Sequence, residues 1–308
     1  MLLKGLYTAL ITPFKSNGDL DENGLRELLH AQLAHEVDGI VVLGTTGEAP
    51  TLSQMEKTKV IQIAREEIQG KCLLIVGTGS YSTQQTIEQT RLAEEMGADA
   101  ALIVTPYYNK PTQEGLFRHF ESICSATSLP VCLYNIQGRT GQNLQTDTLE
   151  RLMAFDSIIG IKEGSGNISQ IGEVIEMVQK TKNDFSVLSA DDALTLPLIA
   201  LGGQGIISVM SNLIPGPMKA LTMAAINGNF EYAREWHYRL IPLFKAAFIE
   251  TNPIPIKAAM SLFGLPAGPC RLPLCELQAR NHETLSELIN QLPKEWMANY
   301  GQTKFASC

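Results

Sequence analysis

The sequence predicts an α/β fold: a (β/α)8 barrel followed by a small all-helical C-terminal domain. Eight short, largely β-branched apolar runs recur along the chain, and helical stretches with one apolar face alternate with them. The runs are continuously apolar, as expected of parallel strands that are buried on both faces. No dinucleotide-binding motif follows the first run, so a closed barrel is favoured, with an open doubly wound sheet as the alternative.

The predicted strands are followed by recognisable helix starts. Asp21, Thr112 and Asn167 each precede an apolar helical pattern, and Ser53 with Glu56 has the spacing of a capping box. The eight strands are predicted at residues 6–11, 39–43, 73–76, 100–104, 131–134, 158–161, 185–188 and 205–209.

The strand pattern stops after Val209. Pro215-Gly216-Pro217 opens the expected eighth barrel helix, and the remaining chain is helical in pattern over 230–248, 255–263 and 283–292. We therefore predict a catalytic barrel over residues 1–224 and a helical domain over 225–308, with a loose tail from Lys304.

Composition narrows the class of function. The chain has 308 residues, with 24 Lys and Arg against 32 Asp and Glu, a formal net charge of −8. The acidic balance and the lack of a Lys/Arg run argue against nucleic-acid binding. No apolar stretch is long enough to cross a membrane, and the first residues lack the features of a signal peptide. A cytoplasmic protein with a small-molecule substrate is expected.

Cysteine and histidine spacing predicts no metal site. The six cysteines form no C-x-x-C pair, and the five histidines are scattered. Reduced, structural cysteines are expected.

In a (β/α)8 barrel, catalytic groups come from the carboxyl ends of the strands, and this rule selects Lys162 and Tyr134. Lys162 follows the apolar run 158–161, where a lysine partly removed from water loses proton affinity and can form an imine with a ketone. The alternative is an ordinary lysine neutralised by Glu163. Tyr134 ends the fifth strand and could pass protons beside such a lysine, whereas taken alone it is a buried tyrosine with a polar tip.

Other strand ends carry binding candidates. Gly44-Thr45-Thr46-Gly47 could turn several backbone N–H groups toward an anion, although a plain tight turn explains it as well. Arg139 could clamp a carboxylate or be an exposed loop charge. Asp191-Asp192 is most simply a helix N-cap with a first-turn charge, and Gly202-Gly203 a helix C-cap.

Together these motifs resemble the dihydrodipicolinate synthase / N-acetylneuraminate lyase family, and specifically its synthase branch. The resemblance extends over about residues 5–292. The matching segments are 44–48, 104–109, 133–135, 139–141, 160–163, 202–208 and 252–257.

The resemblance implies a Schiff-base-forming lyase of lysine and diaminopimelate biosynthesis that condenses pyruvate with L-aspartate 4-semialdehyde and needs no cofactor. Lys162 would form the imine with pyruvate. Tyr134, Thr45 and Tyr108 would relay protons, with Tyr108 supplied by a partner subunit. Thr46 and the backbone of Ile207 would hold pyruvate, and Arg139 would receive the carboxylate of the aldehyde.

The resemblance also implies a homotetramer built as a dimer of dimers, with Tyr107 and Tyr108 at the tight dimer interface. Sibling enzymes that share the lysine and the tyrosine, N-acetylneuraminate lyase and 2-keto-3-deoxy sugar acid aldolases, are the alternative function. A barrel that only binds a carboxylate metabolite is a third. The Arg139 and Gly44 motifs favour the synthase.

Two departures from the synthase pattern have consequences. Gln137 and Gly138 stand where proline and serine are usual, which could reposition the Arg139 loop. Lysine-inhibited relatives bind lysine with histidine, asparagine and glutamate, and we predict weak or absent lysine inhibition because these positions have changed. The matching positions here are Pro50, Gln54, Lys57, Tyr81 and Gln85.

Overall fold

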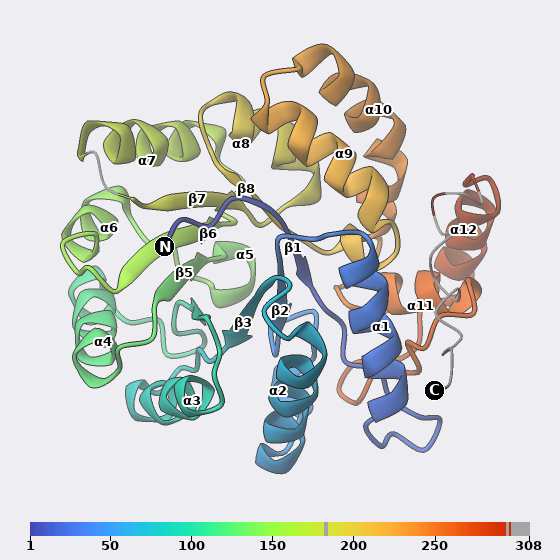
Figure 1. Ribbon diagram of the computed structural model, residues 1–308, viewed down its shortest axis with the longest axis horizontal. Helices are drawn as coiled ribbons and strands as arrows, with labels where there is room; N and C mark the ends of the chain where they lie inside the picture. Colours follow the sequence, from blue (N-terminus) through green and yellow to red (C-terminus); the bar gives the residue numbers. More distant parts are fainter. Residues whose placement is uncertain (182–183, 294–295, 297–308) are drawn as a thin grey trace.

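Eight parallel strands form a closed barrel in the computed structural model, which describes residues 1–181, 184–293 and 296 (Figure 1). The strands pair in chain order, and β8 returns to pair with β1. The predicted barrel is confirmed. The strands are β1 Gly5–Ala9, β2 Gly39–Val42, β3 Leu73–Gly77, β4 Ala100–Val104, β5 Val131–Asn135, β6 Ile158–Glu163, β7 Ser186–Ser189 and β8 Gly205–Ser208.

Helices surround the barrel, and the C-terminal helices α10–α12 gather on one side of it (Figure 1). The helices are α1 Glu22–Ala34, α2 Gln54–Ile68, α3 Thr83–Glu95, α4 Gln113–Ala126, α5 Gln137–Thr140, α6 Thr146–Leu152, α7 Ile168–Thr181, α8 Thr195–Ala200, α9 Pro215–Ile226, α10 Phe230–Ala246, α11 Ile254–Leu262 and α12 Ala279–Asn290. Three short 3-10 turns, η1 Ala49–Thr51, η2 Asp192–Leu194 and η3 Met210–Asn212, follow β2, β7 and β8.

The predicted helix starts are present. Asp21 and Thr112 accept hydrogen bonds from backbone N–H groups in the first turns of α1 and α4. Ser53 and Glu56 form a complete capping box, and Asn167 accepts from the N–H of Ser169. These caps satisfy N–H groups that a helix leaves unpaired at its start.

Two clusters of apolar side chains stabilise the barrel, one on each face of the sheet. Side chains inside it, including Tyr7, Ile75, Leu102 and Leu188, form a small cluster that fills the interior. A larger cluster lies between the strands and the helices and continues into the C-terminal helices. Burial on both faces explains why the strand sequences are continuously apolar.

Some strands extend beyond their predicted ends, because polar residues continue the hydrogen-bonded pairing between strands. β6 extends two residues beyond the predicted end, so Lys162 and Glu163 lie within the strand, paired in register with Tyr134 and Asn135. Helix α12 begins at Ala279, four residues earlier than predicted.

The predicted tail from Lys304 lies outside the described residues. Within those residues, no helix has the length and apolar character needed to span a membrane.

Candidate active site

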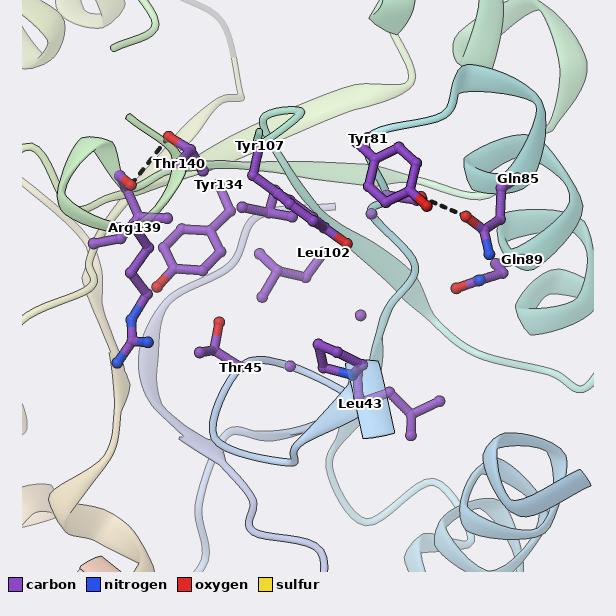
Figure 2. Close-up of a pocket in the computed structure, with 18 of the residues that line it drawn as sticks. Leu43, Thr45, Tyr81, Gln85, Gln89, Leu102, Tyr107, Tyr134, Arg139 and Thr140 are labelled. Carbon is purple, nitrogen blue, oxygen red and sulfur yellow. Dashed lines mark hydrogen bonds between the residues drawn. The ribbon is translucent and has the colours of Figure 1, made fainter. Parts of the chain in front are cut away.

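A cavity of about 530 Å³ opens at the carboxyl ends of the strands (Figure 2). The segments that follow β2, β3, β4 and β5 supply its walls. Among the predicted site residues, Thr45, Tyr134 and Arg139 line it, together with Tyr107. The rule that places barrel chemistry at the strand ends therefore selects residues that share one space.

Lys162 and Tyr134 lie side by side on neighbouring strands. They are register partners in the β5–β6 ladder, and the Lys162 Nζ is 4.3 Å from the centroid of the Tyr134 ring. Both side chains are buried, with 5% and 6% of their surface exposed. The amine is thus held against the ring of Tyr134, which lines the cavity, and is largely removed from water, while Lys162 itself is not among the lining residues.

Glu163 is engaged elsewhere. Its carboxylate accepts hydrogen bonds from the N–H of Ser165 at 2.7 Å and from Nδ2 of Asn135 at 3.3 Å. Consecutive residues of a strand point to opposite faces, so Lys162 points into the barrel and Glu163 away from it. Burial raises the pKa of Glu163. This arrangement disfavours the interpretation of Lys162 as a lysine neutralised by its neighbour.

The Gly44-Thr45-Thr46-Gly47 segment forms a tight turn after β2. The N–H of Gly47 donates to the Gly44 carbonyl, and the N–H of Glu48 donates to the Thr45 carbonyl, each at 3.1 Å. Thr45 is half-buried and extends toward the same space as the Tyr134 hydroxyl (Figure 2). Thr46 is buried, and its Oγ1 accepts a hydrogen bond from Nδ2 of Asn252 at 2.9 Å.

Arg139 lies on the single turn of helix α5, which ends at Gly141 with φ of 72°. The side chain is exposed, and Nη2 donates to the carbonyl oxygen of Asn252 at 3.1 Å. Figure 2 shows the guanidinium beyond Tyr134, on the side of Thr45. With Gln137 and Gly138 present, the loop still brings Arg139 to the cavity.

Asn252 is the residue that the sequence reasoning missed. It contacts both Thr46 and Arg139, and its Oδ1 is buried without a hydrogen-bond partner among the described residues. The available signal was segment 252–257, which matched the family pattern but to which no role was assigned. A cis peptide bond joins Asn252 and Pro253.

The two tyrosines after β4 have different surroundings. Tyr107 lines the cavity and packs edge-on against Tyr81, with ring centroids 5.5 Å apart, and burial raises its pKa. Tyr108 has φ of 70° and is 90% exposed. It does not line the cavity of its own chain, so its supply to a partner's site stays a prediction.

Ile207 is fully buried on β8 inside the barrel, outside the residues that line the cavity. The segment after it is fixed by Asp192, which accepts hydrogen bonds from Ser208 Oγ and from the N–H groups of Val209 and Met210. Burial raises the pKa of Asp192 to about 6.

The two neighbouring aspartates therefore differ. Asp191 is the predicted N-cap, since it accepts a hydrogen bond from the N–H of Ala193. Asp192 lies in the interior with no exposed surface, because its carboxylate joins the segment after β7 to the end of β8. Asp192 is the first-turn acidic residue, as predicted, and its burial against β8 is a feature that the pattern did not indicate.

Metal binding has no support in the described part of the chain, where His, Cys, Asp and Glu form no cluster of three suited to a metal ion. The cysteines within it, Cys72, Cys124, Cys132, Cys270 and Cys275, are free thiols. Burial raises the pKa of Cys132, which lies in the barrel interior, to about 12. A thiol that keeps its proton is a poor nucleophile.

Comparison with known proteins agrees with this geometry. The model of the dihydrodipicolinate synthetase family matches residues 2–292. The chain is 65% identical over 299 residues to a 4-hydroxy-tetrahydrodipicolinate synthase of Protochlamydia amoebophila, covering 97% of this chain and 100% of the relative. It is 46% identical over 292 residues to the enzyme of that name from Methanocaldococcus jannaschii, covering 94% and 99%.

Solved structures give the same picture. Dihydrodipicolinate synthase from Thermotoga maritima superposes with a TM-score of 0.92 at 42% identity, covering 94% of this chain and 98% of that one. The Acinetobacter baumannii enzyme, solved with pyruvate, has a TM-score of 0.90 at 38% identity, covering 93% and 98%. A lysine-bound enzyme from Cyanidioschyzon merolae has a TM-score of 0.88 at 39% identity, covering 97% and 98%. The chain belongs to the dihydrodipicolinate synthetase family.

Proposed function

We propose that this protein condenses pyruvate with L-aspartate 4-semialdehyde to form 4-hydroxy-tetrahydrodipicolinate, in lysine and diaminopimelate biosynthesis. One observation carries the proposal: a buried lysine amine, that of Lys162, lies 4.3 Å from the ring centroid of Tyr134 beside a cavity at the barrel's carboxyl end. Family membership supports the choice of substrates.

The amine of Lys162 attacks the keto carbon of pyruvate, and loss of water leaves an iminium ion. The positive nitrogen acts as an electron sink, so a proton leaves the methyl group and an enamine forms. The enamine carbon then attacks the aldehyde carbon of the semialdehyde. Attack of the semialdehyde's amino group on the imine carbon closes the ring and releases the lysine.

Each further residue has a role in this scheme. Tyr134 gives and accepts protons during imine formation, and Thr45 with the partner subunit's Tyr108 completes the proton relay. Thr46 and the Ile207 backbone hold pyruvate. Arg139 pairs with the carboxylate of the semialdehyde. These groups supply the charge and hydrogen bonds that a protein of net charge −8 needs locally to bind two carboxylate substrates.

The assembly is also part of the proposal. A homotetramer of two tight dimers would cover the exposed Tyr108 at the tight interface. We keep the division into a barrel over 1–224 and a helical domain over 225–308, and a cytoplasmic location, as predictions.

Borohydride trapping tests the chemistry. Incubation with pyruvate and borohydride is expected to add one reduced pyruvate adduct at Lys162, identified by peptide mass spectrometry. Lys257, also buried, is the internal control and should stay unmodified. Absence of an adduct would refute the proposal.

A comparison of acceptors tests the specificity. Aspartate semialdehyde is expected to be turned over, whereas sugar aldehydes are not. An adduct at Lys162 with turnover of sugar aldehydes alone would point to the sibling aldolases.

A further inference from the structure

A buried ion pair lies directly behind the turn that carries Thr45 and Thr46. The Lys257 Nζ is 2.8 Å from Oε1 of Glu48, and the two side chains are 2% and 0% exposed. Glu48 is the residue after the turn, whereas Lys257 lies on α11, 209 positions further along the chain. The proposed chemistry uses neither residue.

Every polar atom of the pair has partners. The Lys257 ammonium also donates to the carbonyl oxygens of Thr12 at 3.0 Å and Pro269 at 2.7 Å. The second oxygen of Glu48 accepts from the N–H of Arg271 at 2.9 Å. The Phe14 ring lies 4.4 Å from the ammonium. The three N–H groups of the Lys257 ammonium thus donate to three acceptors, and these hydrogen bonds fix the orientation of the side chain.

Stability alone is a weak reason for such a pair. Burial lowers the pKa of Lys257, and the Glu48 charge opposes that effect. Buried ion pairs replaced by apolar side chains often leave a protein equally stable, because the cost of removing two charges from water offsets their attraction. A buried ion pair can instead restrict the surrounding chain to one conformation. Here the restricted segment is the backbone at Glu48.

The backbone at Glu48 needs such fixing. Its φ of 52° lies in the left-handed region, which costs energy for a residue with a side chain. The Glu48 N–H closes the turn onto the Thr45 carbonyl. The hydroxyl of Thr12, whose carbonyl accepts from Lys257, also donates to the Gly47 carbonyl at 2.6 Å.

Helix α11 therefore holds the turn at two points. Asn252, just before the helix, binds the Thr46 hydroxyl, and Lys257, one turn into the helix, binds Glu48. We propose that Glu48 and Lys257 are positioning residues that hold Thr46 in place for pyruvate and Thr45 in place for the proton relay. The inference rests on the proposed function, since it assigns the turn to pyruvate.

The double variant Glu48→Gln/Lys257→Met tests this directly, because it removes both charges and leaves no buried charge unpaired. It is expected to fold with a thermal midpoint close to that of the wild type. Its KM for pyruvate should rise about 10- to 100-fold, the size of effect expected when a binding group shifts by about 1 Å. The KM for the aldehyde should stay near the wild-type value, because Arg139 is held by Asn252 instead.

Glu48→Gln alone is a second variant that retains the side-chain shape and, through its amide oxygen, the hydrogen bond to the Arg271 N–H, but it leaves the Lys257 ammonium without its counter-ion. Its KM for pyruvate should also rise, and more pyruvate should be needed for half-maximal borohydride trapping at Lys162. The control replaces the exposed Glu176–Lys180 pair by Glu176→Gln/Lys180→Met, which should change neither KM.

Wild-type KM for pyruvate in folded Glu48→Gln or in the folded double variant would overturn the inference. So would an equal loss of affinity for both substrates. Should the double variant fail to fold, Glu48→Gln decides. If the wild-type enzyme itself traps no pyruvate, the proposed function fails first and this inference with it.

Discussion

The amine of Lys162 lies against the ring of Tyr134, 4.3 Å from its centroid, because the two residues are register partners on adjacent strands of the barrel. Parallel pairing places them at the same height, and both side chains point inward. The arrangement is set by the strands, which are the most rigid part of the fold, and not by a loop.

Tyr134→Phe separates the role of the hydroxyl from that of the ring. The variant keeps the packing against Lys162 and loses only the proton-transferring group, so kcat is expected to fall by about 10²- to 10⁴-fold. The thermal midpoint should change little. Steady-state kinetics and thermal unfolding measure both.

Tyr7→Phe is the matched control for this substitution. Tyr7 belongs to the same interior cluster, but its hydroxyl accepts a hydrogen bond from the N–H of Lys4, before β1 begins. Its kcat should stay at the wild-type value. Equal losses in the two variants would mean that Tyr134 contributes only packing.

Arg139→Lys tests the recognition of the aldehyde. Lysine keeps the charge but loses the two-pronged hydrogen bonding of a guanidinium. The kcat/KM for aspartate semialdehyde should fall about 10- to 1000-fold, while half-saturation of pyruvate trapping at Lys162 stays unchanged. Arg118→Lys, at a position exposed on α4, is the control. A loss confined to pyruvate would assign Arg139 to the other substrate.

Local residue patterns made much of the barrel and part of the site predictable. Burial on both faces imposes a continuous apolar run on each strand, and the runs ended close to the strand ends. Lys162, Tyr134 and Thr45 could be selected because strand order alone brings their ends to one face of a barrel.

Contacts between distant segments could not be predicted in this way. Asn252 reaches Thr46 across 206 positions, and Lys257 reaches Glu48 across 209. Such contacts depend on how α11 packs over the barrel, which no local pattern encodes. Asp192 shows the same limit, because its first-turn position was predictable, whereas the burial of its carboxylate against β8 was not.

Lysine is expected to inhibit this enzyme weakly or not at all. Lys57 and Gln85 line the cavity, and burial lowers the pKa of the Lys57 ammonium. The ammonium groups of a bound lysine would be repelled by the Lys57 ammonium. The uncharged Gln85 offers no carboxylate to offset that repulsion. Assays with millimolar L-lysine should show little change in rate. Micromolar inhibition would contradict the prediction.

A gain-of-function variant sharpens that test. Lys57→His/Gln85→Glu removes the cation and adds a carboxylate, so lysine sensitivity should increase. Gln84→Glu adds the same charge at an exposed position on the same helix and should leave the response unchanged.

Glu56 is expected to contribute stability that disappears in acid. The Arg271 guanidinium donates hydrogen bonds to both oxygens of Glu56, one of them at 3.0 Å, and holds its pKa down at about 2, against an ordinary value of 4.5. A carboxyl with a depressed pKa stabilises the folded state fully above pH 4.5, and this contribution is lost as pH falls toward 2. Glu56→Gln should therefore lower the free energy of unfolding by about 1–3 kcal/mol at pH 7.

The difference between wild type and Glu56→Gln should shrink steadily below pH 4.5, as urea unfolding at a series of pH values can measure. Glu176→Gln, which breaks a solvent-exposed pair with Lys180, should have little effect at any pH. A destabilisation by Glu56→Gln that is constant from pH 7 to pH 3 would show that the capping box with Ser53, rather than the charge on Arg271, accounts for the role of Glu56. Arg271 also donates its backbone N–H to Glu48. The same arginine therefore connects the start of α2, through Glu56, with the turn behind the cavity.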